Sequence, residues 1–363
     1  MLDNLVALET KTDFQQSMER IYAWYNQEII DRPPVRFHQH NAEFANAGKP
    51  DSQWSSVKER WFDAEHQVDH FIRQLEGIQF KAETFPMFMP NLGPEIYSAF
   101  YGAELEYGEI TAWAIPLIKE WENLPEFKLD SSNDYFRKIE EMTALAIERC
   151  EGRYWVGYTD LHPGVDCLAA WRDPQELCMD LVLNPEEVEN ILPLTIRDFE
   201  WVFNHFGRMM KAAGHPSITW MGIPSFERVH IPSCDFSSMI SPEHFEHFCL
   251  PILLKEVQYA EHNIFHLDGK GVARHIDPIL DVPEINAIQW VQGLGDDKPI
   301  AQWIPLIQKI QKAGKSVILD IELDELELVM KELDATGIMI WVPAAKEEQD
   351  EVVRRLERWV CRN

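Results

Sequence analysis

The 363-residue sequence is poor in basic residues, with 33 Lys and Arg against 61 Asp and Glu, which gives a net charge of −28. A surface this acidic repels the phosphates of nucleic acids and anionic lipids, so we exclude both as partners. No apolar run approaches the roughly 20 residues that a membrane-spanning helix needs. The first nine residues lack the basic and then apolar pattern of a signal peptide, and we expect a cytoplasmic protein.

The sequence also lacks any Cys-x-x-Cys pair. Its six cysteines are scattered, and in the absence of an export signal we expect reduced thiols, most of them core residues. No glycine-rich dinucleotide turn follows an early strand, which argues against a doubly wound open sheet, the main alternative fold. No repeat, low-complexity tract or linker divides the chain, so residues 1–363 are predicted to form one domain.

Short apolar strands alternate with amphipathic helices after a helical lead-in over residues 1–31. The nine strand candidates are Val35–His38, Lys81–Phe88, Tyr154–Tyr158, Ile218–Gly222, Val229–Ile231, Ile264–Leu267, Ala287–Val291, Val317–Ile321 and Ile338–Val342. This alternation predicts an α/β fold with a parallel sheet, and the strand count predicts a TIM (β/α)8 barrel with one additional strand. We expect Val229–Ile231 to be the additional strand, because it follows Ile218–Gly222 so closely.

In a βα barrel the carboxyl ends of the strands converge on one pocket, so the residues at these ends are the candidate site. Many of them carry carboxylate, imidazole or indole groups. They are His38, His40, Asn91, Tyr158, Asp160, His162, Trp220, Cys234, Asp235, His266, Asp268, Gln289, Trp290, Asp320 and Trp341.

His266 and Asp268 form the most informative pair, since a spacing of two places both side chains on one face of a strand, just before a glycine-rich turn. Such a pair can bind a metal ion or transfer protons. Alternatively, His266 makes only a structural hydrogen bond and Asp268 caps the next helix. Asp160 and His162 form a similar pair, which could equally be a capped turn.

A third metal ligand is available in Cys234. A thiolate, an imidazole and a carboxylate suit Zn²⁺ or another divalent ion, although Cys234 could instead be a buried thiol. Trp220, Trp290 and Trp341 could form a flat apolar pocket for a methylated ligand, or simply pack at the top of the barrel.

The segment Ile240-Ser241-Pro242-Glu243-His244-Phe245, followed by the His266 turn, resembles the uroporphyrinogen decarboxylase superfamily. That superfamily also contains zinc-dependent methyltransferases that act on corrinoid proteins. Segments comparable to Asp31–Val35 and Gly337–Ile340 occupy similar places in the family. The resemblance implies a TIM barrel, often a homodimer, with metal bound at the turn that holds His266.

The departures from the family are equally informative. The methyltransferases have His-x-Cys-Gly and a later cysteine, whereas this chain has His266-Leu267-Asp268-Gly269 and no cysteine after Trp341 in Val342–Ala345. The decarboxylase has an arginine-rich first loop and a catalytic aspartate. The matching segments here are Arg36–Asn41, with one arginine, and Met89–Asn91, with no carboxylate. Decarboxylation of uroporphyrinogen itself is therefore not expected.

Three functions remain open. The first is metal-assisted methyl transfer with a small methylated substrate or a corrinoid protein as partner, in which His266, Asp268 and Cys234 hold the metal. The second is a metal-free decarboxylase or other lyase, in which Asp160, His162, His266 and Asp268 transfer protons. The third is a non-catalytic binder of a small molecule. The residues expected to contact that molecule are His38, Asn91, Tyr158, Trp220, Asp235, Gln289, Trp290 and Trp341.

Overall fold

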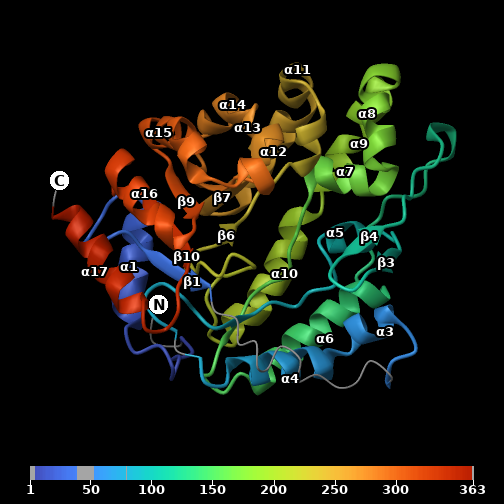
Figure 1. Ribbon diagram of the computed structural model, residues 1–363. Coiled ribbons are helices and arrows are strands. Elements are labelled where there is room, and N and C mark those ends of the chain that lie inside the picture. Colours follow the sequence, from blue (N-terminus) through green and yellow to red (C-terminus); the bar gives the residue numbers. More distant parts are fainter. Residues whose placement is uncertain (1–4, 39–52, 79, 362–363) are drawn as a thin grey trace.

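The computed structural model describes residues 5–38, 53–78 and 80–361. Its centre is a curled parallel sheet with helices on its outer side (Figure 1). The sheet order is β1 (Val35–His38), β10 (Ile338–Pro343), β9 (Ser316–Asp320), β8 (Ile285–Val291), β7 (His262–Asp268) and β6 (Val229–His230). A separate parallel pair joins β2 (Met87–Phe88) to β5 (Trp155–Val156). The predicted α/β fold with a parallel sheet is confirmed, but these ladders do not by themselves show a closed barrel.

One strand assignment was wrong. Val229–His230 pairs with β7 inside the main sheet, whereas Ile218–Gly222 forms no strand. Instead, Ser217 and Ser225 form an isolated antiparallel bridge around this segment, and Gly222 has a positive φ of 64° that ends any extended run. The additional segment is therefore Ile218–Gly222, because an apolar run alone does not reveal whether its backbone joins a ladder.

Helices connect the strands. The longer ones are α1 (Phe14–Tyr25), α4 (Ala64–Leu75), α6 (Asp134–Arg149), α7 (Gly164–Arg172), α8 (Pro174–Leu183), α9 (Pro185–Ile196), α10 (Phe199–Ala212), α15 (Ile304–Lys312) and α17 (Gln349–Val360). The shorter ones are α3 (Val57–Phe62), α5 (Ile96–Ala99), α11 (Pro242–His244), α12 (Leu250–Glu256), α13 (Gly269–Ala273), α14 (Ile276–Leu280) and α16 (Leu326–Glu332). An antiparallel hairpin joins β3 (Leu105–Tyr107) to β4 (Ala112–Ala114). No helix in the described residues is both long and apolar enough to cross a membrane.

Alternation along the strands sorts side chains between two cores. Phe265 and Leu267 of β7 pack in the larger core with the outer helices, while Ile264 belongs to a second core on the inner side of the sheet. Trp24 and Tyr25 of α1 join that inner core. Because side chains on a strand alternate between its two faces, His266 and Asp268 lie on the inner side with Ile264.

The amino ends of the strands are fastened by a buried ion pair. Glu83 accepts hydrogen bonds from both terminal nitrogens of Arg32, at 2.7 and 3.0 Å, and from the backbone nitrogen of Val35 at 2.7 Å. Both side chains are almost fully buried. This pairing fixes the start of β1 against the segment before β2. Additional hydrogen bonds of this kind help to make a buried ion pair tolerable in a protein interior.

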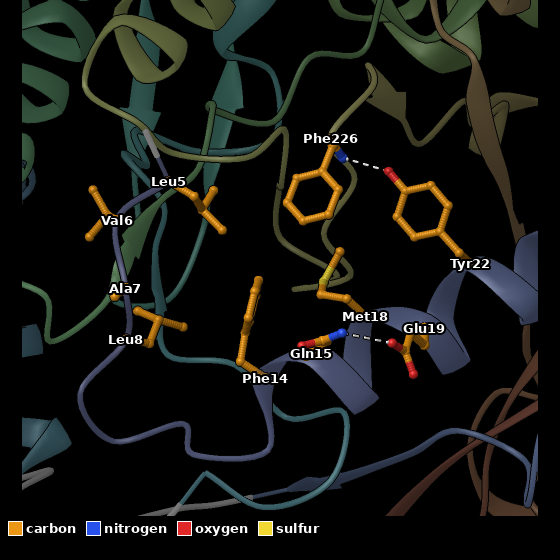
Figure 2. Close-up of a pocket in the computed structure, with 10 residues that line it drawn as sticks. All are labelled: Leu5, Val6, Ala7, Leu8, Phe14, Gln15, Met18, Glu19, Tyr22 and Phe226. Atoms are coloured by element: carbon orange, nitrogen blue, oxygen red, sulfur yellow. Dashed lines mark hydrogen bonds between the residues drawn. The ribbon is translucent and has the colours of Figure 1, made fainter. Parts of the chain in front are cut away.

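An apolar cavity of about 550 Å³ lies beside α1. Like the Arg32–Glu83 ion pair, it lies away from the carboxyl ends of the strands. Figure 2 shows Leu5, Leu8, Phe14, Met18 and Phe226 among the side chains that line it. At its rim the Tyr22 hydroxyl accepts a hydrogen bond from the backbone nitrogen of Phe226 at 2.8 Å.

Candidate metal site at the carboxyl ends of the strands

Asp235, His266 and Asp268 form a group whose metal-binding atoms all lie within 4.8 Å of one another. His266 and Asp268 come from the carboxyl end of β7, and Asp235 begins the neighbouring 3-10 helix η3 (Asp235–Met239). One imidazole nitrogen and two carboxylate oxygens suit Zn²⁺, Mn²⁺ or Fe²⁺. Ligand atoms around a tetrahedral ion lie roughly 3.4 Å apart at bond lengths of about 2.1 Å, so small side-chain rotations would bring all three onto one ion.

The orientation of His266 is set by Gln289 of the adjacent strand. Their backbones are paired in register, and His266 Nδ1 lies 2.6 Å from Gln289 Oε1. Because a carbonyl oxygen only accepts, this contact places the imidazole proton on Nδ1 and leaves the lone pair of Nε2 free. Histidine ligands of metal ions are commonly oriented by such an outer hydrogen bond. The Trp220 ring packs edge-on against His266, with ring centroids 5.3 Å apart.

The two carboxylates of the group lack protein partners. Among the described residues, neither Asp235 nor Asp268 accepts a side-chain hydrogen bond, and Asp268 does not cap α13. The alternative role of Asp268 as a helix cap is therefore wrong. Burial and the nearby Asp166 raise the pKa of Asp235 to about 6, and His266 and His162 limit the rise. Carboxylates held this close without a hydrogen-bonding partner are available to a cation.

A close backbone approach brings Asp235 to the β7 turn. A Cβ atom on Gly271 would lie 2.8 Å from Ser238 Cβ, so only glycine lets η3 pack against the start of α13. Arg274 then donates to the backbone oxygens of Ser238, at 3.2 Å, and Gly271, at 2.8 Å. The second glycine of the turn thus places Asp235 beside Asp268.

Asp166, at the first turn of α7, holds the other end of η3. Its carboxylate accepts from the backbone nitrogens of Asp235 and Phe236, each at 3.0 Å, and from Ser233 Oγ at 3.0 Å. The sequence pattern did not identify Asp166, because its partners lie almost 70 residues away. An Asp within the first turn of a helix that follows His162-Pro163 was the only available signal.

His162 carries a positive charge within this network. Nε2 donates to Asp160 at 2.8 Å, and Nδ1 donates to Ser233 Oγ at 2.7 Å, since the Ser233 hydroxyl proton is already committed to Asp166. Burial alone would lower the pKa of His162, but the neighbouring carboxylates, Asp160 above all, raise it to about 10. Near neutral pH His162 is therefore an imidazolium and not a free base.

Cys234 does not join the metal-binding group. Its thiol is buried beside Cys249 in the outer core, and hydrogen bonding to Cys249 together with burial raises its pKa well above the usual value. A thiol held in this state is a poor metal ligand, because binding requires the thiolate. Asp235, predicted to contact substrate, occupies the position that sequence reasoning gave to Cys234.

Two further predicted site residues lie on the outer side of the sheet. Trp290 is fully buried against Trp303, with ring centroids 4.7 Å apart, and Tyr158 packs on Phe203 while its hydroxyl donates to the Val229 oxygen at 2.6 Å. The three tryptophans therefore form no common cage.

The remaining predicted residues lie nearer the carboxyl ends. His38 Nε2 lies 3.1 Å from Asp320 Oδ1, and the His38 ring packs edge-on to Trp341 at 6.2 Å. Asn91 accepts from the backbone nitrogen of Gly93 at 2.8 Å in an exposed turn. The structure thus gives Asn91 a turn-forming contact, while His40 falls outside the described residues.

No protein-family model matches the sequence, and no curated protein matches it. The structure is similar to that of a methyltransferase from Methanosarcina mazei, with a TM-score of 0.59 and 13% sequence identity. The match covers 94% of this chain and 98% of the other. At this identity the similarity establishes a shared fold over nearly the whole chain.

Proposed function

We propose that this protein is a metal-dependent methyltransferase of the uroporphyrinogen decarboxylase-like type. The observation that carries the proposal is the set of Asp235, His266 and Asp268 at the carboxyl ends of the strands. Within the described part of the chain, their carboxylate oxygens and His266 Nε2 have no hydrogen-bonding partner. The fold shared with an archaeal methyltransferase supports the same reaction class. Fold alone does not determine chemistry, so the site has to supply the argument.

The proposal includes a closed eight-stranded barrel made of β1, β2 and β5–β10. Two hydrogen bonds support this closure, from the Glu83 backbone nitrogen to the Val35 oxygen at 3.0 Å and from the Tyr158 hydroxyl to the Val229 oxygen of β6 at 2.6 Å. They lie at the two gaps between the main sheet and the β2–β5 pair. A homodimer and a corrinoid partner protein, both implied by the family resemblance, complete the proposal.

A bound Zn²⁺ or similar ion would supply Lewis acidity to a thiol, hydroxyl or amine of the substrate. His266 would be a ligand through Nε2, with Gln289 holding the ring and its proton at Nδ1. Asp235 and Asp268 would complete the protein ligands. Trp220 excludes water from one side of His266. The imidazolium of His162 offsets part of the negative charge of Asp160, Asp166 and Asp235.

The direct test is a methyl-transfer assay with methylcob(III)alamin and a panel of thiols and amines, followed by the absorbance change and by mass spectrometry of the methylated product. We expect activity that a chelator removes and Zn²⁺ or Mn²⁺ restores, and that His266→Ala abolishes. Turnover that is unaffected by the chelator, or carbon dioxide release from a carboxylate substrate, would instead favour the metal-free lyase. Unchanged recovery of every tightly bound compound would favour a binding protein.

A further inference from the structure

A cavity of about 300 Å³ opens directly beside the metal-binding group, because Asp235 belongs to both. Most of its wall is apolar and comes from α7, η3 and the turn before α5. Ala169, Ala170, Phe236 and Met239 are among the residues of this wall. The volume is at the lower limit of small-molecule sites and suits a compact ligand of few heavy atoms.

The polar part of the same wall is negative. It contains the carboxylates of Glu95, Asp166 and Asp235 against one imidazolium, that of His162. The Asp166 oxygens are occupied by three donors, so Glu95 and Asp235 are the carboxylates available to a ligand. One oxygen of Glu95 accepts from the backbone nitrogen of Ala114, and within the described chain the other has no partner.

We infer that this cavity binds a small organic cation with an apolar surface, of the size and type of a methylated ammonium group. The apolar wall would accept the methyl groups, while Glu95 and Asp235 would neutralise the charge without a directed hydrogen bond, which a quaternary ammonium cannot donate. An anionic ligand would meet a net negative wall, and a polar uncharged one would lose hydration against the apolar residues.

The inference deepens the proposed function by naming its substrate class. That this ligand is the methyl-transfer substrate rests on the proposed function, whereas its binding in the cavity does not. A ligand seated in the cavity would have its methyl groups next to Asp235 and hence next to the metal-binding group. Burial raises the pKa of Glu95, and a cationic ligand beside this side chain would stabilise its charged form.

The test compares choline with 3,3-dimethylbutan-1-ol, its neutral isostere, by isothermal titration calorimetry on the metal-free protein. We expect choline to bind at least 10-fold more tightly. Glu95→Gln should weaken choline binding several-fold and leave the isostere unchanged. The matched control Glu186→Gln, which removes an exposed charge from α9, should change neither. Ala170→Leu should fill the cavity and weaken both compounds, with its folding confirmed by circular dichroism.

Equal affinity for the two compounds, or choline binding that is insensitive to Glu95→Gln, would overturn the inference. Measuring the metal content of the same preparation distinguishes a failure of the cation site from a failure of the proposed function. Protein that binds a metal but not choline would contradict the cation site alone. Protein that binds choline but never a metal would retain the cation site and contradict the metal-dependent methyltransferase.

Discussion

The two ends of the parallel sheet hold carboxylates in opposite states. At the amino ends Glu83 accepts hydrogen bonds from Arg32, Arg20 and the Val35 backbone, and it is buried. At the carboxyl ends Asp235 and Asp268 accept none from the described side chains. Unpaired charges at close range cost stability, so they are retained where a ligand is expected to supply the missing partner. Pairing thus distinguishes the structural carboxylate Glu83 from the two carboxylates of the metal-binding group.

The largest expected effect is at the amino ends. Glu83→Gln leaves the Arg32 guanidinium buried without a counter-charge and should lower the free energy of unfolding by about 3–5 kcal/mol. Urea denaturation measures this change. The exposed carboxylate of Glu332, paired with Lys331, provides the control, since Glu332→Gln should cost less than about 1 kcal/mol. Similar losses of unfolding free energy in the two variants would show that the buried ion pair of Glu83 is worth no more than the exposed one of Glu332.

Two histidines sharpen the comparison through pH. Burial lowers the pKa of His215 to about 4, so the folded protein keeps it neutral while the unfolded chain protonates it near pH 6.5. The contribution of His215 to the free energy of unfolding is fully present above pH 6.5 and falls by up to about 3 kcal/mol as the pH drops towards 4. His162 behaves oppositely, because its raised pKa of about 10 gives stability that is present below pH 6.5 and lost as the pH rises towards 10.

Stability measured from pH 4 to 7 in the wild type and in His215→Gln tests the first effect. The variant keeps an acceptor for the Val156 backbone nitrogen, which lies 3.3 Å from His215 Nδ1. Its curve should be flatter over this range. Parallel curves would show that His215 is not held neutral.

The next effect concerns the glycine that brings η3 to the β7 turn. Gly271→Ala would place a Cβ atom 2.8 Å from Ser238 and move Asp235 away from Asp268. We expect metal affinity to fall about 10- to 100-fold, the usual range for residues that support ligands from outside the coordination sphere. Gly207→Ala on α10, where a Cβ meets nothing within 4 Å, is the matched control. Equal metal affinity in the two variants would show that Gly271 does not position the site.

The smallest expected effect comes from removing a charge at the carboxyl ends. Asp268→Asn relieves repulsion between two carboxylates within 4.8 Å of each other, which is worth roughly 1 kcal/mol in water. The metal-free variant should therefore be slightly more stable than the wild type, while its metal binding is weakened. Thermal unfolding with and without added metal measures both. A clear loss of stability in the metal-free variant would indicate a structural role for Asp268.

The parallel sheet could be predicted from the sequence, because buried strands are continuous apolar segments and helices begin at recognisable N-cap residues. Asp173, which precedes Pro174, accepts from the backbone nitrogens of Gln175 and Glu176 at the start of α8, a capping contact typical of an Asp before a proline that begins a helix. Which apolar segment pairs with a neighbouring strand could not be predicted, since Ile218–Gly222 is as apolar as β6. Only backbone pairing, which depends on distant residues, separates the two.

The site was predictable where one strand supplies both residues. A spacing of two fixes His266 and Asp268 on one face, and the same rule excludes Gln289 and Trp290 from sharing a side of β8. Of these two residues of β8, Gln289 is the one that contacts His266, while Trp290 packs in the outer core. The choice between Cys234 and Asp235 could not be made, because adjacent residues at the start of a 3-10 helix point in different directions that tertiary packing decides.

The metal content of the purified protein tests the central claim most directly. Protein prepared without a nickel column, loaded with Zn²⁺ or Mn²⁺ and dialysed, would be measured by inductively coupled plasma mass spectrometry beside His266→Ala and Cys234→Ser. The account predicts about one metal ion per chain in the wild type and in Cys234→Ser, and almost none in His266→Ala. A wild-type protein that retains no metal, or a His266→Ala variant that retains a full equivalent, would contradict it.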